Sequence, residues 1–214
     1  MGIAFVVLFI ASVTVSTAPS NTASDREWLA AYASHGEQAR HLATGVLLVL
    51  AALALMTFLT HLWTRIVAAS DRRLSPLPVV AAGVASACIA CGGVVMASTA
   101  GSSLLYSQPI PSADVLRLGN DLGFAMVGIA GMFAASVSIV SVSAQARSAG
   151  VFGVGMLRLS WAVAVVLLGS IAFVPILALL IWLVAVAVVL IQSGIPVEQA
   201  NPRTSSATIR AALE

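Results

Sequence analysis

Cys88 and Cys91 are the two residues of this chain whose types and spacing point most directly to chemistry. Three positions apart on a helix, they share one face, where two thiols can form a redox pair or supply half of a metal site. They lie about ten residues into an apolar run that begins near Pro78, at a depth of roughly 15 Å. A thiol surrounded by hydrocarbon stays protonated and unreactive. With Gly92 and Gly93 beside them, both cysteines are predicted to be small packing residues at a close helix contact, and a membrane-embedded thiol or metal protein is the alternative.

His61 is the next candidate, because an ionisable residue at membrane depth is a functional hypothesis by default. It lies four residues before Arg65, near the edge of its apolar run. A proton relay would need a carboxylate partner, and the nearest such residue inside a span, Asp121, is expected at the opposite edge of a core about 30 Å thick. We therefore predict that His61 meets water at the membrane surface and that the two residues form no dyad.

Small and hydroxyl-bearing residues recur at steps of three and four in a later apolar run. Such a stripe lets helices approach closely and form hydrogen bonds across the contact, so helix packing is the first interpretation. The alternative is a polar lining for a solute pathway, which predicts a cavity that contains Ser138, Ser141 or Thr57. The stripe consists of Gly131, Ala134, Ser138, Ser141 and Gln145.

Other residues that ligate metals or catalyse reactions are few. His35, Glu37 and His41 could offer two imidazoles and a carboxylate to zinc, but their spacing matches no HExxH-type arrangement, and a solvated surface is expected there. No glycine-rich phosphate loop, Gly-x-Ser-x-Gly elbow or pair of carboxylates occurs. The sequence therefore predicts no catalytic residue, no cofactor and no metal.

The composition decides what kind of molecule positions these residues. The 214 residues are 60% hydrophobic and 8% charged, and the mean hydropathy is +1.04. A soluble domain carries about 25% charged residues, and a disordered chain lacks apolar content, so both classes are excluded. The ten basic residues are all arginines, and a net charge of +2 spread over the chain excludes a nucleic-acid partner. The chain is predicted to be an all-α integral membrane protein.

Charged residues and prolines divide the chain into apolar runs that can cross a bilayer, each needing about 20 residues. The last run, 159–197, is 39 residues long and contains Pro175. It is predicted to form two short spans, and one long helix kinked at Pro175 gives a five-span alternative. The six predicted spans are Gly2–Ala18, Leu42–Thr64, Val79–Tyr106, Leu122–Ala146, Met156–Phe173 and Ile176–Ser193.

The arginines favour six spans over five. With the N-terminus inside, six spans place seven of the ten arginines on the cytoplasmic side, whereas five spans divide them equally. Cytoplasmic loops carry an excess of Arg and Lys, so both termini are expected in the cytoplasm. The first run has no basic residue before it, and Pro19 disfavours cleavage there, so we expect an uncleaved span and a natural start upstream of Met1.

The segment after the first span predicts a short helix on the outer surface. Ser24 and Glu27 have the spacing of a capping box, and Gly36 is a natural stop. Trp28 and Tyr32 fall on one face, so we expect them to anchor an amphipathic helix at the membrane surface. Farther along the chain, Asp114, Arg117 and Asp121 share a helix face and are expected to form local charge pairs.

Four segments together resemble a family of mostly actinobacterial six-span membrane proteins of unknown function. The resemblance covers most of residues 1–193 and implies the six-span layout and a plasma-membrane location, with no catalytic residues to carry over. This chain departs from the family in lacking basic residues before the first span and directly after the last. The segments are WLAAYASH at 28–35, THLWTR at 60–65, VLRLGNDLGF at 115–124 and LIWLV at 180–184.

The sequence thus predicts one transmembrane helical bundle over residues 1–194 and a flexible cytoplasmic tail over 195–214. A structural or accessory role is the first functional hypothesis. A small-solute transporter or channel is the second, and a thiol or metal protein that uses Cys88 and Cys91 is the third. The expected partners are the lipid bilayer and a second copy or another membrane protein, bound through the small-residue helix faces.

Overall fold

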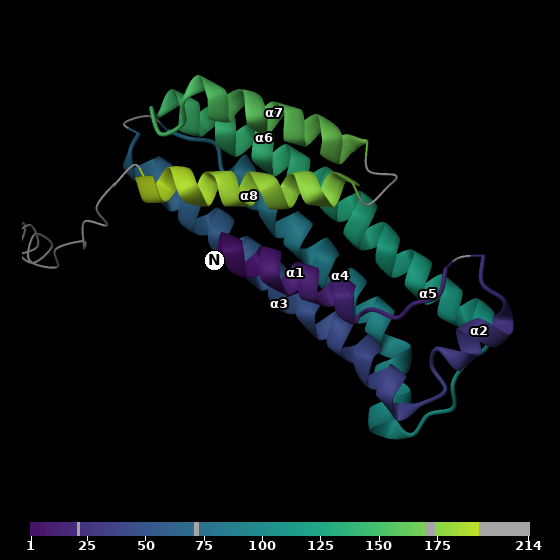
Figure 1. Ribbon diagram of the computed structural model, residues 1–214. Helices are drawn as coiled ribbons and strands as arrows, with labels where there is room; N and C mark the ends of the chain where they lie inside the picture. The colour runs from purple at the N-terminus through teal and green to yellow at the C-terminus, as the bar shows by residue number, and fades with distance from the viewer. Residues whose placement is uncertain (21, 71–72, 170–173, 193–214) are drawn as a thin grey trace, which may run out of the picture.

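A computed structural model describes residues 1–20, 22–70, 73–169 and 174–192, and every regular element in these ranges is a helix. The predicted all-α fold is therefore confirmed (Figure 1). The predicted tail, 195–214, lies outside the described residues. The elements are α1 (Gly2–Val15), α2 (Asp25–Ala30), α3 (His35–Ala68), α4 (Leu77–Tyr106), α5 (Ala113–Ala125), η1 (Met126–Gly131), α6 (Met132–Ser148), α7 (Val154–Leu168) and α8 (Val174–Gln192).

Three long helices dominate the molecule. These are α3, α4 and the continuous stretch Ala113–Ser148, in which α5, η1 and α6 follow one another without a break. At 1.5 Å per residue they are about 45 to 54 Å long, and each contains a window apolar enough to cross a membrane. The apolar helices α1 and α7 are shorter, with 14 and 15 residues. The helices establish three candidate membrane spans by length and composition.

Six helices pack into a closed ring. Around the ring, α1 contacts α3, α3 contacts α4, α4 contacts α6, α6 contacts α7, α7 contacts α8, and α8 returns to α1. Large apolar side chains from all six helices fill the space between them, so one continuous core holds the bundle together. Its most deeply buried large side chains include Phe5, Leu55, Ile89, Met132, Leu167 and Trp182.

The long run around Pro175 contains two helices. Helix α7 ends at Leu168, α8 begins at Val174, and Figure 1 shows the two running side by side in opposite directions. The buried indole Nε1 of Trp182 in α8 donates a hydrogen bond to Ser160 Oγ in α7 at 2.8 Å. Pro175 lies in the first turn of α8, where its missing N–H removes no intrahelical bond. A single helix kinked at this proline is not what the structure shows.

Glycines bring the long helices close together. A Cβ added to Gly45 in α3 would lie 2.4 Å from Ala97 Cβ and 2.6 Å from the Gly93 carbonyl oxygen in α4. On the neighbouring side of α4, a Cβ on Gly92 would lie 2.7 Å from the carbonyl oxygen of Gly123. The backbones therefore touch at both contacts, as small residues at membrane helix interfaces allow.

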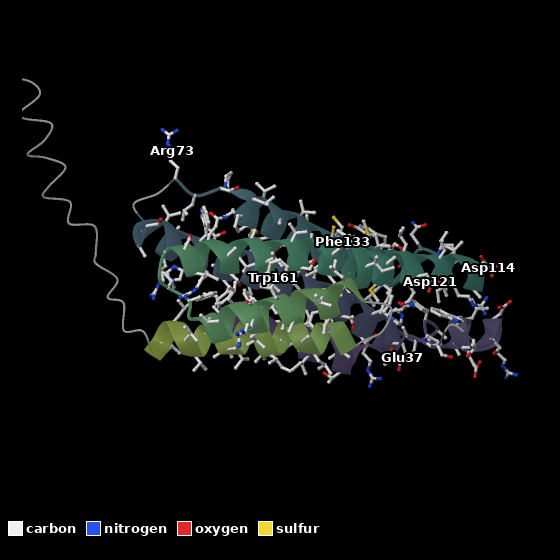
Figure 2. All side chains as sticks on the ribbon, turned by 90° about the horizontal axis from the view of Figure 1, so that it is seen from above. Glu37, Arg73, Asp114, Asp121, Phe133 and Trp161 are labelled. Atoms are coloured by element: carbon white, nitrogen blue, oxygen red, sulfur yellow. The ribbon has the colours of Figure 1, made fainter. Side chains whose placement is uncertain are left out.

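The outside of the ring is apolar along its middle. Phe133 and Trp161 are 59% and 52% exposed, and Figure 2 shows them near the middle of the bundle, between the charged ends. A surface apolar to this degree is covered by lipid in a membrane protein. The apolar helices therefore imply contact with a lipid bilayer.

Candidate functional site

The two ends of the bundle carry different charges. Five carboxylates and three arginines of the described residues lie toward one end, here called the acid end. Figure 2 shows Glu37, Asp114 and Asp121 toward this end and Arg73 at the other. The other end, here called the arginine end, has no carboxylate among the residues that the structure describes. The acid end holds Asp25, Arg26, Glu27, Glu37, Arg40, Asp114, Arg117 and Asp121, and the arginine end holds Arg65, Arg73, Arg147 and Arg158.

At the acid end, helix α2 begins with the predicted capping box. The Glu27 carboxylate accepts hydrogen bonds from the backbone N–H of Ser24 at 2.7 Å and from its hydroxyl at 2.8 Å, and Ser24 Oγ accepts from the Glu27 N–H at 3.4 Å. These bonds satisfy helix-end donors that otherwise have no partner. The backbone and then the side-chain hydrogen bond from Ser24 lower the pKa of Glu27.

Trp28 and Tyr32 are not membrane anchors, which corrects the expectation from the sequence. Trp28 is fully buried and Tyr32 nearly so, in a small cluster with Ala100, Ala113 and Leu116. The apolar face of this segment covers the ends of α4 and α5 rather than lipid. Burial raises the pKa of Tyr32 to about 12. The segment is thus a folded cap on the bundle.

Arg117 joins this cap to α5. Its guanidinium pairs with Asp25 at 2.6 Å and with Asp114 at 3.2 Å, and it donates to the Ala23 carbonyl oxygen at 2.9 Å. It also lies over the Trp28 ring, 6.0 Å from the centroid. The pairing of Asp114 with Arg117 was predicted, whereas the longer-range pair with Asp25 was not.

His41 is buried beneath the cap, although the sequence predicted a solvated surface there. Its ring stacks on Tyr32 with centroids 4.1 Å apart and planes 4° apart. Desolvation lowers the pKa of His41, against smaller opposing effects of the Ala31 carbonyl and Glu37. Gln38 Nε2 donates to the Tyr32 carbonyl oxygen at 2.9 Å, and His35 is exposed. No cluster of three His, Cys, Asp or Glu side chains that could hold a metal occurs in the described part of the chain.

The arginine end contains a groove between α1, α3 and α8, here called the His61–Arg65 groove. Its volume is about 770 Å³. Arg65 Nε donates a hydrogen bond to His61 Nε2 at 3.2 Å, and Arg65 is half-buried. The rest of the groove is mostly apolar. It is lined by Met1, Gly2, Ile3, Thr57, Phe58, His61, Arg65, Ala187, Leu190 and Ile191.

The other candidate residues do not gather at one site. His61 belongs to the arginine end and the exposed Asp121 to the acid end, at opposite ends of the bundle. Cys88 is half-buried and Cys91 is exposed, while Gly92 and Gly93 occupy the close helix contacts, so the prediction that both cysteines pack at such a contact is wrong for Cys91. The structure does not gather His61, Asp121 and the two cysteines at one site.

The hydroxyls of the predicted stripe are bonded to backbone oxygens. Ser138 Oγ donates to the Pro78 carbonyl oxygen at 2.9 Å, which links α6 to the start of α4. Ser141 Oγ donates to the Val137 carbonyl oxygen at 2.7 Å, and Thr57 Oγ1 donates to that of Leu53 at 2.8 Å. Ser141 borders an almost wholly apolar groove between α6 and α7 that also contains Phe133 and Trp161. Ser138 and Ser141 therefore share no polar cavity, whereas Thr57 also lines the His61–Arg65 groove.

The π-helical turn η1, Met126–Gly131, interrupts the long helix between α5 and α6 and has no counterpart among the predicted elements. Such wide turns occur frequently at functional sites. Val127 and Gly128 of this turn line a mostly apolar cavity of about 160 Å³, together with Ser12 and Thr44. No feature of the sequence distinguishes this turn, because its residues are ordinary for an apolar helix.

Comparison of the chain with protein-family models, with curated proteins and with solved structures found no match. The resemblance to a six-span membrane family therefore stays a prediction.

Proposed function

We propose that this chain is a six-span membrane protein with a structural or accessory role and without catalytic activity. The observation that carries the proposal is the closed ring of helices around an apolar core. A solute pathway needs polar groups that face a water-filled space. In the described residues, the hydroxyls of Ser138 and Ser141 instead donate to backbone carbonyls. The core therefore supports a packed bundle better than a pore.

The ring also supports the six-span layout. The shorter helices α1 and α7 lie beside the long helices α3 and α6, and α8 lies between α1 and α7, so none of the three lies across an end of the bundle (Figure 1). A helix that packs alongside a membrane-crossing helix also runs across the bilayer. By the positive-inside rule the arginine end is cytoplasmic, and the plasma membrane is the proposed location.

Accessibility of single cysteines tests the layout. In a background with Cys88 and Cys91 replaced by alanine, Ser112→Cys reports the acid end, Ser148→Cys the arginine end and Gly169→Cys the α7–α8 connection. A membrane-impermeant maleimide added to intact cells is expected to label Ser112→Cys and Gly169→Cys, and to label Ser148→Cys only after permeabilisation. Labelling of Gly169→Cys only after permeabilisation would contradict six spans.

Reconstitution tests the role. Liposomes that contain the purified protein are expected to show the ion conductance and small-solute permeability of protein-free liposomes. A protein-dependent flux that is lost in the Ser138→Ala and Ser141→Ala variants would replace the proposed role with that of a transporter.

A further inference from the structure

The His61–Arg65 groove combines two chemistries in one space. Its polar side consists of the Arg65 guanidinium, the His61 imidazole and Thr57. Its other walls are apolar and come from the first turn of α1, the last turns of α8 and Phe58 of α3. A volume of about 770 Å³ is far larger than one inorganic ion needs and falls within the range of sites for organic ligands. The groove therefore suits an elongated molecule with one charged part.

We propose that this groove binds an anionic phospholipid, with the headgroup phosphate at Arg65 and His61 and an acyl chain along Ile3, Ala187 and Ile191. Lipid binding would be an additional function, and it shares with the proposed structural role only the premise that the helices lie in a membrane.

Arg65 supplies the charge complementarity. A guanidinium has five N–H donors, and the bond to His61 Nε2 uses only the one on Nε. No carboxylate of the described residues lies within 4 Å of Arg65, whereas Arg40 and Arg117 at the acid end are both paired. The two terminal nitrogens of Arg65 are therefore available to a phosphate, which a planar guanidinium binds through two parallel hydrogen bonds.

His61 strengthens the site on the same helix face. Because its Nε2 accepts a hydrogen bond from Arg65, the neutral ring carries its proton on Nδ1 and has one donor left. His61 and Arg65 are four residues apart in α3, so both side chains project from the same side of the helix toward the groove. The bond between His61 and Arg65 holds the guanidinium on this face, with its terminal nitrogens free of the imidazole.

The depth of the groove matches a phospholipid. Arg65 directly follows the uncharged run Leu42–Thr64, so it lies where the hydrocarbon core gives way to the headgroup layer. Ile3, Ala187 and Ile191 line the same groove, and Ile3 and Ile191 are exposed on the outside of the bundle. Basic pockets between membrane helices on the cytoplasmic side are known to bind anionic headgroups.

Lipid binding by the full-length protein in detergent tests the proposal. The probes are phosphatidylglycerol, phosphatidylcholine with the same acyl chains, and inorganic phosphate, with binding measured by native mass spectrometry and by the shift of the thermal midpoint. Phosphatidylglycerol is expected to bind at least tenfold more tightly than phosphatidylcholine. Arg65→Gln is expected to abolish that preference, while Arg73→Gln, at an exposed arginine of the same end, retains it.

Two further variants keep the test decisive if Arg65→Gln fails to fold. Arg65→Lys keeps the charge but loses the planar donor pair, and is expected to weaken phosphatidylglycerol binding severalfold. Ala187→Trp fills the apolar wall and is expected to reduce the affinity for both lipids. Equal binding of the two lipids, unchanged binding by the Arg65 variants, or displacement of the lipid by inorganic phosphate alone would each overturn the proposal. The maleimide labelling described above does not depend on lipid binding, so the two proposals fail separately.

Discussion

The charged side chains have different partners at the two ends of the bundle. At the acid end several charged side chains pair with one another: Arg117 pairs with Asp25 and Asp114, and Glu37 binds both Arg40 and the Thr17 hydroxyl. At the arginine end no carboxylate of the described residues lies within 4 Å of a described guanidinium. One end is a folded, self-contained cap, and the other is open to external anions.

The helix starts show the same contrast. At the acid end, the hydroxyls of Ser24 and Ser34 accept backbone N–H groups at the beginning of α2 and α3, although Ser112 at the start of α5 does not. At the arginine end, Pro76 and Gly153 occupy the equivalent positions of α4 and α7 and offer no side-chain cap. The arginine end has polar bonds of its own, because Ser75 Oγ accepts the Leu77 N–H at 3.3 Å and the Gln145 side chain bonds the Ser75 backbone. The contrast therefore lies in the capping residues themselves.

A substitution that pushes α3 away from α4 should lower the thermal stability most, because the contact between these two helices supports the acid end. Gly45→Val places new atoms against Ala97 Cβ and the Gly93 carbonyl, and neither can move without shifting a helix. Overpacking of this kind costs about 1–3 kcal/mol or more, so the thermal midpoint in detergent should fall by several degrees.

Gly119→Ala is the matched control. A Cβ at Gly119 meets nothing within 4 Å, and alanine is favoured over glycine inside a helix by about 1 kcal/mol. The midpoint should stay unchanged or rise. Equal losses in the two variants would contradict the role assigned to the close contact.

Arg117→Met should produce the second largest effect, because it removes two ion pairs and the bond to Ala23 while keeping the aliphatic volume. Its side chain is only 24% exposed, and the loss should be about 1–2 kcal/mol, decreasing as salt is added. Arg73→Met, at an exposed position of the arginine end, should change the midpoint little. The measurement is thermal unfolding of both variants at low and high salt.

Apolar periodicity and charge spacing predicted much of this architecture. The helix ranges, the capping box at Ser24 and the pairing of Arg117 with Asp114 depend on residues close together in the chain, and the structure contains them. The close approach at Gly92 and Gly93 also follows from residue size alone. Features of this kind can be predicted from the sequence because they depend on the size, charge and helix preference of individual residues.

Features that depend on distant partners could not be predicted in this way. The pattern of Trp28 and Tyr32 shows an apolar face but not what covers it, and protein rather than lipid covers it here. Similarly, the sequence marks His61 as a candidate residue, but the groove around His61 and Arg65 is formed with α1 and α8, which are distant in the chain. Burial of His41 under Tyr32 depends on the return of the chain after α2.

Acid should loosen the acid end before the rest of the bundle. Burial keeps His41 neutral and lowers its pKa below the ordinary 6.5, so the unfolded chain takes up a proton that the folded chain resists. Stability is therefore fully present above pH 6.5 and declines as the pH falls below it, by about 1.4 kcal/mol for each unit of depression.

Thermal midpoints between pH 7.5 and 5.5 measure this effect above the range in which carboxylates ordinarily titrate. His41→Phe preserves the stacking on Tyr32 and should flatten the pH profile, whereas His35→Ala, at an exposed histidine, should leave the profile as in the parent. A pH-dependent loss that persists in His41→Phe would assign the effect to another group.

Ser24→Ala should have the smallest effect on stability, and this effect should be confined to the folded segment around Trp28 and Tyr32 that caps the bundle. The hydroxyl accepts the Glu27 N–H and donates to its carboxylate, and a helix cap of this kind contributes about 1 kcal/mol. Because α2 has six residues and touches the bundle mainly through α5, its opening leaves the ring intact. The amides of α2 should exchange with solvent about fivefold faster, while the global thermal midpoint stays within 1 °C or so of the parent. A midpoint loss as large as that of Arg117→Met would mean that the cap and the ring unfold as one unit, and the two ends would then differ in charge but not in stability.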